Sequence, residues 1–203
     1  MYPKLIQNIE GLDLSSIPSQ RKEILKVLAA FIQKKKGEGA PILLNFICTH
    51  NSRRSQFAQI WAQLAAAYFK IPVISSSAGV EVTAFNERAV ASIKRFGFEV
   101  QSKGKENPHY TVSFDAHSKP LLLFSKHLDE EPISDPFAAV MTCAHADENC
   151  PFIPAAEARI ALRYEDPKVF DNTPLEATKY DERSFEIAAE LFYVFKRAKE
   201  HQA

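Results

Sequence analysis

The sequence has 203 residues, of which 46% are hydrophobic and 25% are charged, as in an ordinary globular domain. Its 25 basic and 25 acidic residues cancel, so the net charge does not favour nucleic acid or an anionic membrane as a partner. No apolar run approaches the roughly 18 residues of a membrane span, and the N-terminus lacks the layout of a secretory signal. We therefore expect a cytoplasmic protein that binds neither nucleic acid nor a membrane.

The first half of the chain predicts helices and strands in alternation. Residues 19–36 repeat apolar side chains at helical spacing, and three lysines in their last turn complement the helix dipole. The near-continuous apolar run at 42–47 is typical of a central strand covered on both faces. The further elements are a helix at 55–69, a strand at 71–76 and a helix at 86–96. The apolar face expected for the first helix is Ile24, Val27, Leu28 and Phe31.

The second half of the chain predicts a less regular order. Alternating apolar and polar residues at 110–114, followed by an apolar run at 121–124, indicate a β-hairpin or an extended flap. Strands are expected at 138–142 and 159–164, and a closing helix at 184–196.

The order of these elements predicts an α/β fold with a four-stranded parallel sheet flanked by helices. We expect residues 1–39 to form a helical extension that packs on an α/β domain at 40–203. The flap would then be an insertion in that domain, at about residues 104–134.

The segment that begins at Cys48 and ends at Ser55 lies between a predicted strand and a predicted helix. Ligands of parallel sheets bind beyond the carboxyl ends of the strands, where loop N–H groups and a helix N-terminus attract anions. Arg54 can hold two oxygens through its planar fork. The same positive field favours a thiolate at Cys48, to which Ser55 can donate a hydrogen bond. The candidate oxyanion-binding residues are Thr49, His50, Asn51, Ser52, Arg53, Arg54 and Ser55.

Two residues of this loop have less specific interpretations. Arg53 is interpreted as a solvated neighbour of the site, with a role in substrate access as the alternative. His50 is interpreted as a surface residue or a lid over the pocket, since no partner for a catalytic base can be identified. A buried strand-end cysteine followed by a chance basic pair is the alternative to the whole loop.

The second and third cysteines, Cys143 and Cys150, are seven residues apart. On a regular helix that spacing separates their Cα atoms by about 10.5 Å, whereas a disulfide needs roughly 4.4–6.8 Å. Residues 144–149 must therefore form a loop, or unwind when a bridge forms. A zinc site that includes His145 lacks the paired short spacing of structural zinc motifs. Two inert buried cysteines are the other alternative.

The run at 46–56 resembles the phosphate-binding loop of the low-molecular-weight protein tyrosine phosphatases. It resembles still more closely the loop of the thioredoxin-coupled arsenate reductases that share their fold. The segments at 77–79, 142–151 and 164–167 also match this family, so the resemblance covers most of residues 41–200. The N-terminal helix and roughly twenty residues of the flap lie outside the common reductase pattern.

The resemblance implies a role for each matching residue. Cys48 would attack an oxyanion such as arsenate or phosphate, and Asp166 would be the general acid. Cys143 would then attack Cys48 to release arsenite, and Cys150 would resolve the resulting disulfide. Thioredoxin would reduce the remaining disulfide between Cys143 and Cys150. Asn51 would keep the shape of the loop, and no cofactor is implied.

Several positions depart from the reductase pattern. Many reductases have Gly at the position of His50 and Cys at that of Arg53. At the position of Gln59 they often have a glutamate implicated in potassium binding, and a neutral amide binds a hard cation less well than a carboxylate. No resident metal site is therefore predicted. At the position of the acid, Glu165 is the alternative to Asp166.

Three functions remain open at this point. The three thiols favour an arsenate reductase. A low-molecular-weight protein tyrosine phosphatase would hydrolyse phosphotyrosine or aryl phosphates through a phosphocysteine intermediate. Against it, Lys168 and Val169 stand where the phosphatases have the tyrosines that wall the substrate slot. A non-catalytic oxyanion or redox sensor, which would expose the flap at 110–124 on oxidation, is the third.

Overall fold

The structure is a computed structural model that describes residues 1–130, 136–149, 153 and 155–200. Its strands are β1 (Ile42–Cys48), β2 (Val73–Gly79), β3 (Glu99–Lys103), β4 (His109–Ser113), β5 (Leu121–Leu123), β6 (Phe137–Met141) and β7 (Ala156–Ala161). Its α-helices are α1 (Pro3–Glu10), α2 (Ser19–Gly37), α3 (Arg54–Phe69), α4 (Glu87–Phe96), α5 (Ala144–Asn149) and α6 (Glu176–Glu200), and 3₁₀ turns lie at Leu128–Glu130 and Pro167–Phe170.

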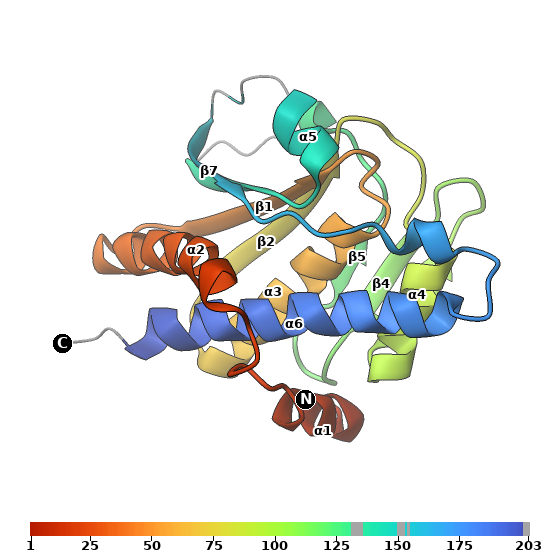
Figure 1. Cartoon of the computed structure of the whole chain (residues 1–203), viewed down its shortest axis with the longest axis horizontal. Helices are drawn as coiled ribbons and strands as arrows, with labels where there is room; N and C mark the ends of the chain where they lie inside the picture. The colour runs from red at the N-terminus through yellow and green to blue at the C-terminus, as the bar shows by residue number, and fades with distance from the viewer. Residues whose placement is uncertain (131–135, 150–152, 154, 201–203) are drawn as a thin grey trace.

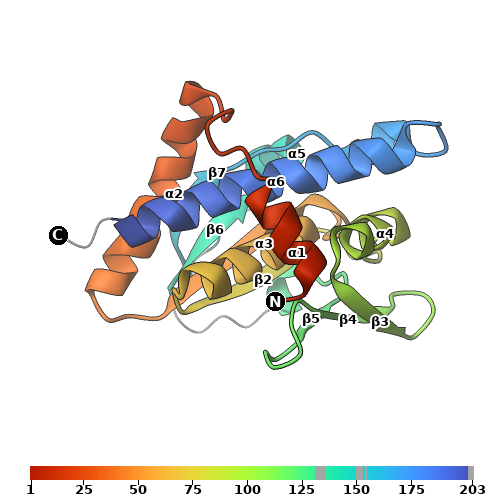
Figure 2. The ribbon, with the colours of Figure 1, turned by 90° about the horizontal axis from the view of Figure 1, so that it is seen from below.

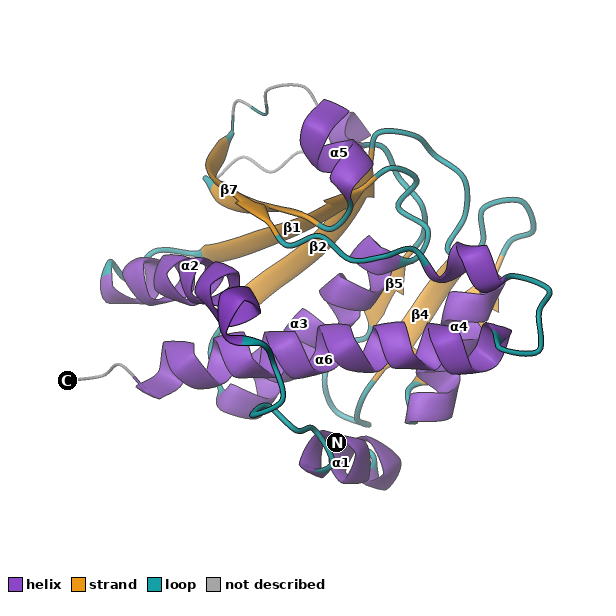
Figure 3. Ribbon diagram, viewed as in Figure 1, coloured by secondary structure: helices purple, strands orange, loops and turns teal. Residues whose placement is uncertain are grey.

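The main sheet has four parallel strands in the order β2-β1-β6-β7 (Figures 1 and 3). The predicted four-stranded parallel sheet flanked by helices is thereby confirmed. β1 lies between two neighbours and six of its seven residues are buried, which explains its near-continuous apolar run. The predicted boundaries were less accurate for the last strand, since β7 begins and ends three residues before the range 159–164.

The helices α3 and α6 lie along one face of this sheet, and α5 lies at the other side of its upper end (Figures 1 and 2). Their apolar sides form the main core, in which Trp61 and Tyr180 are the largest fully buried side chains. α6 begins eight residues before the predicted start at Ser184, because Ala177 and Tyr180 are the apolar residues of its first two turns and are too few to show a helical repeat. No helix in the described part of the chain is long and apolar enough to cross a membrane.

The N-terminal region contains two helices, of which only α2 was predicted. The apolar face expected for α2 was wrong in part, because Val27 is 56% exposed whereas Leu25 and Ile32 are fully buried. The lysines at its end do more than complement the helix dipole. Lys34 and Lys35 both form ion pairs with Glu157 of β7, so they join α2 to the edge of the sheet.

The inserted flap is a separate three-stranded antiparallel sheet in the order β3-β4-β5. The predicted hairpin corresponds to β4 and β5, and β3 is an additional strand. Its residues are largely exposed and show no apolar alternation, so they gave no strand signal. Asn107 anchors the turn after β3 through two hydrogen bonds to the backbone of Ser125, of 2.7 and 3.1 Å.

Candidate active site

The loop from Cys48 to Ser55 connects the end of β1 to the start of α3. Cys48 is the last residue of the strand and is 3% exposed, so its thiol is buried at the start of the loop. Asn51 has a φ of 45°, in the left-handed region that Asn enters more readily than most residues. This backbone conformation turns the chain back over the strand end.

Three carbonyl groups of the loop accept hydrogen bonds from neighbouring segments. The carbonyl of Thr49 accepts hydrogen bonds from the backbone after β2, and that of His50 accepts one from the Ser125 hydroxyl at 2.8 Å. The Ser52 carbonyl accepts one from the N–H of Asn86. The N–H groups of residues 50–53 have no hydrogen-bond partner in the described part of the chain. Such a ring of free donors can bind an oxyanion.

Gly79 allows the loop to approach β2 closely. A Cβ atom at this position would lie 2.7 Å from the backbone nitrogen of Asn51, and 2.8 and 2.9 Å from the carbonyl oxygens of Glu81 and Thr49. These are all backbone atoms, which cannot move without displacing the loop. Gly79 is therefore required for the position of the oxyanion-binding loop.

The thiol of Cys48 lies 3.1 Å from the hydroxyl of Ser55. That hydroxyl oxygen accepts a hydrogen bond of 2.9 Å from the amide of Asn51, so its own proton is free to point at sulfur. The amide oxygen of Asn51 in turn accepts from the N–H of Lys126 at 3.1 Å, which fixes the orientation of the amide. The chain of donors ends at Cys48, to whose sulfur the Ser55 hydroxyl can donate a hydrogen bond.

Arg54 and Asp166 lie side by side, as expected of residues that act on one ligand. The guanidinium of Arg54 donates to the carbonyl of Tyr164 at 3.0 Å and to the Asp166 carboxylate at 2.8 Å. The second oxygen of this carboxylate accepts from the N–H of Lys168. The Nε atom of Arg54 is buried and has no partner among the described residues. It is one donor left for an oxyanion.

Arg53 is not the solvated neighbour that the sequence suggested. Its side chain is only 11% exposed and donates a 2.7 Å hydrogen bond to the Tyr180 hydroxyl. That hydroxyl donates to Asp171 at 2.8 Å, and burial together with this carboxylate raises the pKa of Tyr180. Arg53 therefore holds the loop against α6. The sequence did not predict this contact, because Tyr180 is 127 residues from Arg53 and no motif relates the two.

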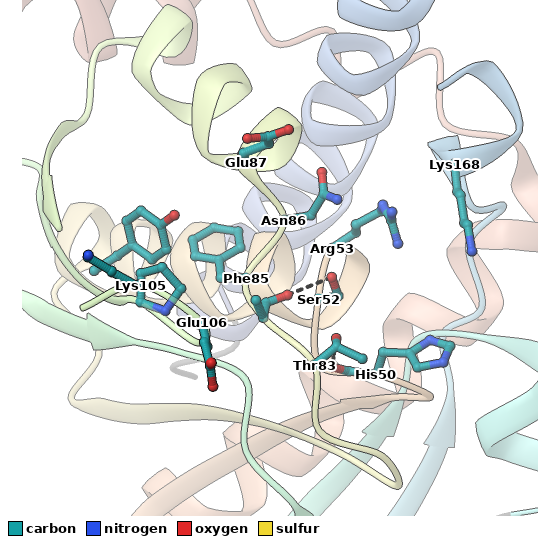
Figure 4. Close-up of a pocket in the computed structure, with 13 residues that line it drawn as sticks. His50, Ser52, Arg53, Thr83, Phe85, Asn86, Glu87, Lys105, Glu106 and Lys168 are labelled. Carbon is teal, nitrogen blue, oxygen red and sulfur yellow. Dashed lines mark hydrogen bonds between the residues drawn. The ribbon is translucent and has the colours of Figure 1, made fainter. Parts of the chain in front are cut away.

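His50 lies at the surface, as interpreted from the sequence, and its Nε2 atom is 2.9 Å from the carboxylate of Glu81. A cavity of about 430 Å³ extends from His50 and Arg53 across the rim of the loop (Figure 4). Its far side is formed by Lys105 and other residues of the turn between β3 and β4. Lys168, whose N–H donates to the carboxylate of Asp166, also lines it. The flap thus forms a wall beside the candidate site.

Cys143 follows β6, the neighbour of β1, and is 1% exposed. Its sulfur is 3.5 Å from the hydroxyl of Thr49 and accepts a hydrogen bond of 3.3 Å from the N–H of Ala146. The Thr49 hydroxyl also lies 3.2 Å from Nδ1 of His145. From the sequence, His145 is a candidate only for a zinc site, and its contact with Thr49 is not predictable because it depends on the packing of α5 against the loop.

Two further sequence-based expectations concern the Cys143–Cys150 disulfide and the potassium position at Gln59. Residues 144–149 form the helix α5, so a disulfide between Cys143 and Cys150 would require this helix to unwind. Cys150 itself lies outside the described residues. Gln59, the candidate potassium position, is buried and its amide is bound to Ser75 and Ser77 of β2.

Comparison with known proteins gives related sequences and a related fold, although no protein-family model matches the chain. The chain is 25% identical to the arsenate reductase of Halalkalibacterium halodurans over 131 residues, which are 64% of this chain and 78% of that protein. It is 29% identical to the arsenate reductase of Staphylococcus aureus strain Newman over 123 residues, or 60% of this chain and 76% of that protein.

The fold is shared with a low-molecular-weight phosphotyrosine phosphatase from Vibrio cholerae O395. The two structures superpose with a TM-score of 0.52 over 80% of this chain and 99% of that one, at 13% sequence identity. At this identity the likeness establishes the fold and leaves the chemistry to the residues of the site.

Proposed function

The chain belongs to the family of the arsenate reductases and low-molecular-weight phosphatases, and from this premise we propose that it is an enzyme that reduces arsenate. The oxyanion would bind in the loop that follows Cys48, against the free N–H groups of residues 50–53 and Nε of Arg54. The thiolate of Cys48 then attacks arsenic. Asp166, whose carboxylate lies beside Arg54, first takes up a proton and then gives it to the departing oxygen as a general acid.

One observation supports reduction over hydrolysis. A second thiol, Cys143, lies against the side chain of Thr49, the residue directly after Cys48. Hydrolysis of a phosphate ester needs only one thiol, because water completes the reaction. Reduction of arsenate needs a second thiol, because the two electrons that arsenic gains are released when two thiols become one disulfide. A buried cysteine at the rim of the loop fits this requirement.

The proposed relay balances in three steps. Displacement of one oxygen of arsenate by the Cys48 thiolate gives a sulfur–arsenic bond. Attack of the Cys143 thiolate on that sulfur forms a disulfide, and the electron pair of the broken bond reduces arsenic from As(V) to As(III), which leaves as arsenite. Cys150 then attacks Cys143, which frees Cys48, and the dithiol of thioredoxin reduces the remaining disulfide.

The proposal is tested by comparing two activities of one variant. In Cys143→Ser, thioredoxin-coupled arsenate turnover should fall to the background, because no second thiol can release arsenite. Hydrolysis of an aryl phosphate should persist within about threefold, since the loop, Arg54 and Asp166 are unchanged. Full arsenate turnover in Cys143→Ser would contradict the relay.

A second candidate function is phosphatase activity, which the cavity of about 430 Å³ beside the loop favours. Arsenate needs no such space, whereas the organic part of a phosphomonoester does. The lining includes the aromatic residue Tyr110 as well as Lys105 and Lys168. A kcat/KM for a phosphotyrosine peptide far above that for phenyl phosphate would favour this function, and equal values would count against it.

A further inference from the structure

We propose that His145 accepts the proton of Cys143 through the hydroxyl of Thr49. This inference rests on the proposed function in one respect, namely that Cys143 must become a thiolate in order to attack. The three groups form a line across the boundary between α5 and the oxyanion-binding loop. Their separations are 3.5 Å from sulfur to the hydroxyl oxygen and 3.2 Å from that oxygen to Nδ1 of His145.

The hydrogen-bonding capacity of these groups gives the line a direction. A threonine hydroxyl has one proton to donate and can accept another. With a neutral thiol and a neutral imidazole, both contacts are satisfied when Cys143 donates to Thr49 and Thr49 donates to His145. Transfer of both protons along the line leaves a thiolate and an imidazolium. The Thr49 hydroxyl then carries the former thiol proton and donates it to sulfur, so the protons balance.

Burial explains why such a relay is needed. Cys143 is 1% exposed, so its proton has no direct path to bulk water. His145 is exposed on α5 and can exchange a proton with solvent. The N–H of Ala146 donates to the sulfur at 3.3 Å and supports the thiolate after the proton has left. An unprotonated ring nitrogen of an imidazole can accept a proton, which suits His145 as the acceptor.

The charges around α5 leave the contact of His145 with Thr49 undisturbed. β1 and β6 pack against α5 and contain no charged residue, and β7 also reaches the helix through Arg159, which donates to the carbonyl groups of Ala146 and Asp147. The two acids of the helix, Asp147 and Glu148, form ion pairs with Arg163, and Asp147 also pairs with Arg159. These carboxylates are therefore engaged on the side of β7, and Thr49 is the hydrogen-bond partner of the His145 ring in the described part of the chain.

The test measures the reactivity of Cys143 without arsenate. In a full-length protein with Cys48→Ser and Cys150→Ser, Cys143 is the remaining thiol. Its thiolate displaces methanesulfinate from methyl methanethiosulfonate and gains an S-methyl group, which intact mass follows over time. The rate is measured from pH 6 to pH 9 in this background and in the same background with His145→Gln.

We expect His145→Gln to slow the reaction about 10-fold or more at pH 7, and the deficit to shrink as the pH rises, because a more basic solution favours the thiolate even without the imidazole. Thr49→Val should show the same deficit, Thr49→Ser should restore most of the rate, and the combination with His145→Gln should add nothing further. The matched control is His117→Gln, an exposed histidine of the flap, which should leave the profile unchanged.

Equal rates at pH 7 with and without His145, or a deficit of the same size at every pH, would overturn the proposal. The second outcome would show that His145 only supports the packing of α5. Because the probe is not arsenate, this result is independent of whether the protein reduces arsenate. Failure of arsenate turnover in the native sequence would contradict the proposed function while leaving the relay to be judged on its own profile.

Discussion

Cys48 and Cys143 each contact a hydroxyl group of the same loop. The two hydroxyl groups differ in their second hydrogen-bond partner. Behind Ser55 is the amide of Asn51, which donates to the hydroxyl oxygen. Behind Thr49 is the imidazole of His145. An amide cannot take up a proton, whereas an imidazole can.

The difference assigns the two thiols to different tasks. In the proposed reaction, Cys48 receives a hydrogen bond from a donor whose orientation is fixed by Asn51. Cys143 has a proton acceptor and can become a thiolate when its attack is due. A second thiolate held permanently beside Cys48 would repel both the first thiolate and the anionic substrate. The comparison predicts that substitutions on the two sides have distinct consequences.

The largest effect is expected from Cys48→Ser. Both arsenate turnover and aryl phosphate hydrolysis should fall at least about 1,000-fold, because the nucleophile common to both reactions is lost. Steady-state assays of the two activities on one preparation check this result. Residual hydrolysis within about tenfold of the unmodified protein would mean that another residue is the nucleophile.

A smaller loss is expected from Arg54→Lys. An ammonium is a point charge and cannot donate at once to Tyr164, to Asp166 and to the oxyanion, as the guanidinium does. Loss of such a positioned donor costs about 100-fold, and both activities should decrease together. A decrease in arsenate turnover alone would mean that Arg54 serves the step of Cys143 and not the step common to both reactions. Arg159→Lys, on β7, is the matched control.

The smallest of the three effects is expected from Asn51→Gly. Glycine tolerates the φ of 45°, so the substitution removes the amide and keeps the backbone. Without the donor behind Ser55, both activities should fall about 10-fold, as for one lost hydrogen bond.

Asn51→Ala separates the two contributions at this position. Alanine at this position must adopt the same positive φ, which glycine tolerates better. The free energy of unfolding of Asn51→Ala should therefore be about 1 kcal/mol lower than that of Asn51→Gly. Chemical denaturation of the two variants measures the difference. If the alanine variant equalled the glycine variant in stability, backbone strain at residue 51 would play no part.

Some elements of the fold could be predicted from the sequence and others could not, for a physical reason. The strand at 42–47, the loop after it and the sheet were predictable because apolar runs and the spacing from Cys48 to Arg54 are local features. β3 was missed because its exposed residues show no alternation. The start of α6 was missed because its first turns carry a single buried apolar contact, at Tyr180.

The site shows the same division. The resemblance named Asp166, and in the structure it lies beside Arg54. The partner of Arg53 and the contact between Thr49 and His145 could not be predicted, because each joins residues about 100 or more positions apart. Such contacts depend on how α5 and α6 pack, and no spacing in the sequence encodes them.

The central claim is that the protein uses two thiols in succession to reduce arsenate, and one measurement tests it most directly. NADPH oxidation by thioredoxin reductase and thioredoxin is followed with and without arsenate, for the native sequence and for Cys143→Ser. The account predicts arsenate-dependent oxidation by the native sequence and none above background by Cys143→Ser. Absence of arsenate-dependent oxidation by the native sequence, or equal oxidation by both proteins, would contradict it.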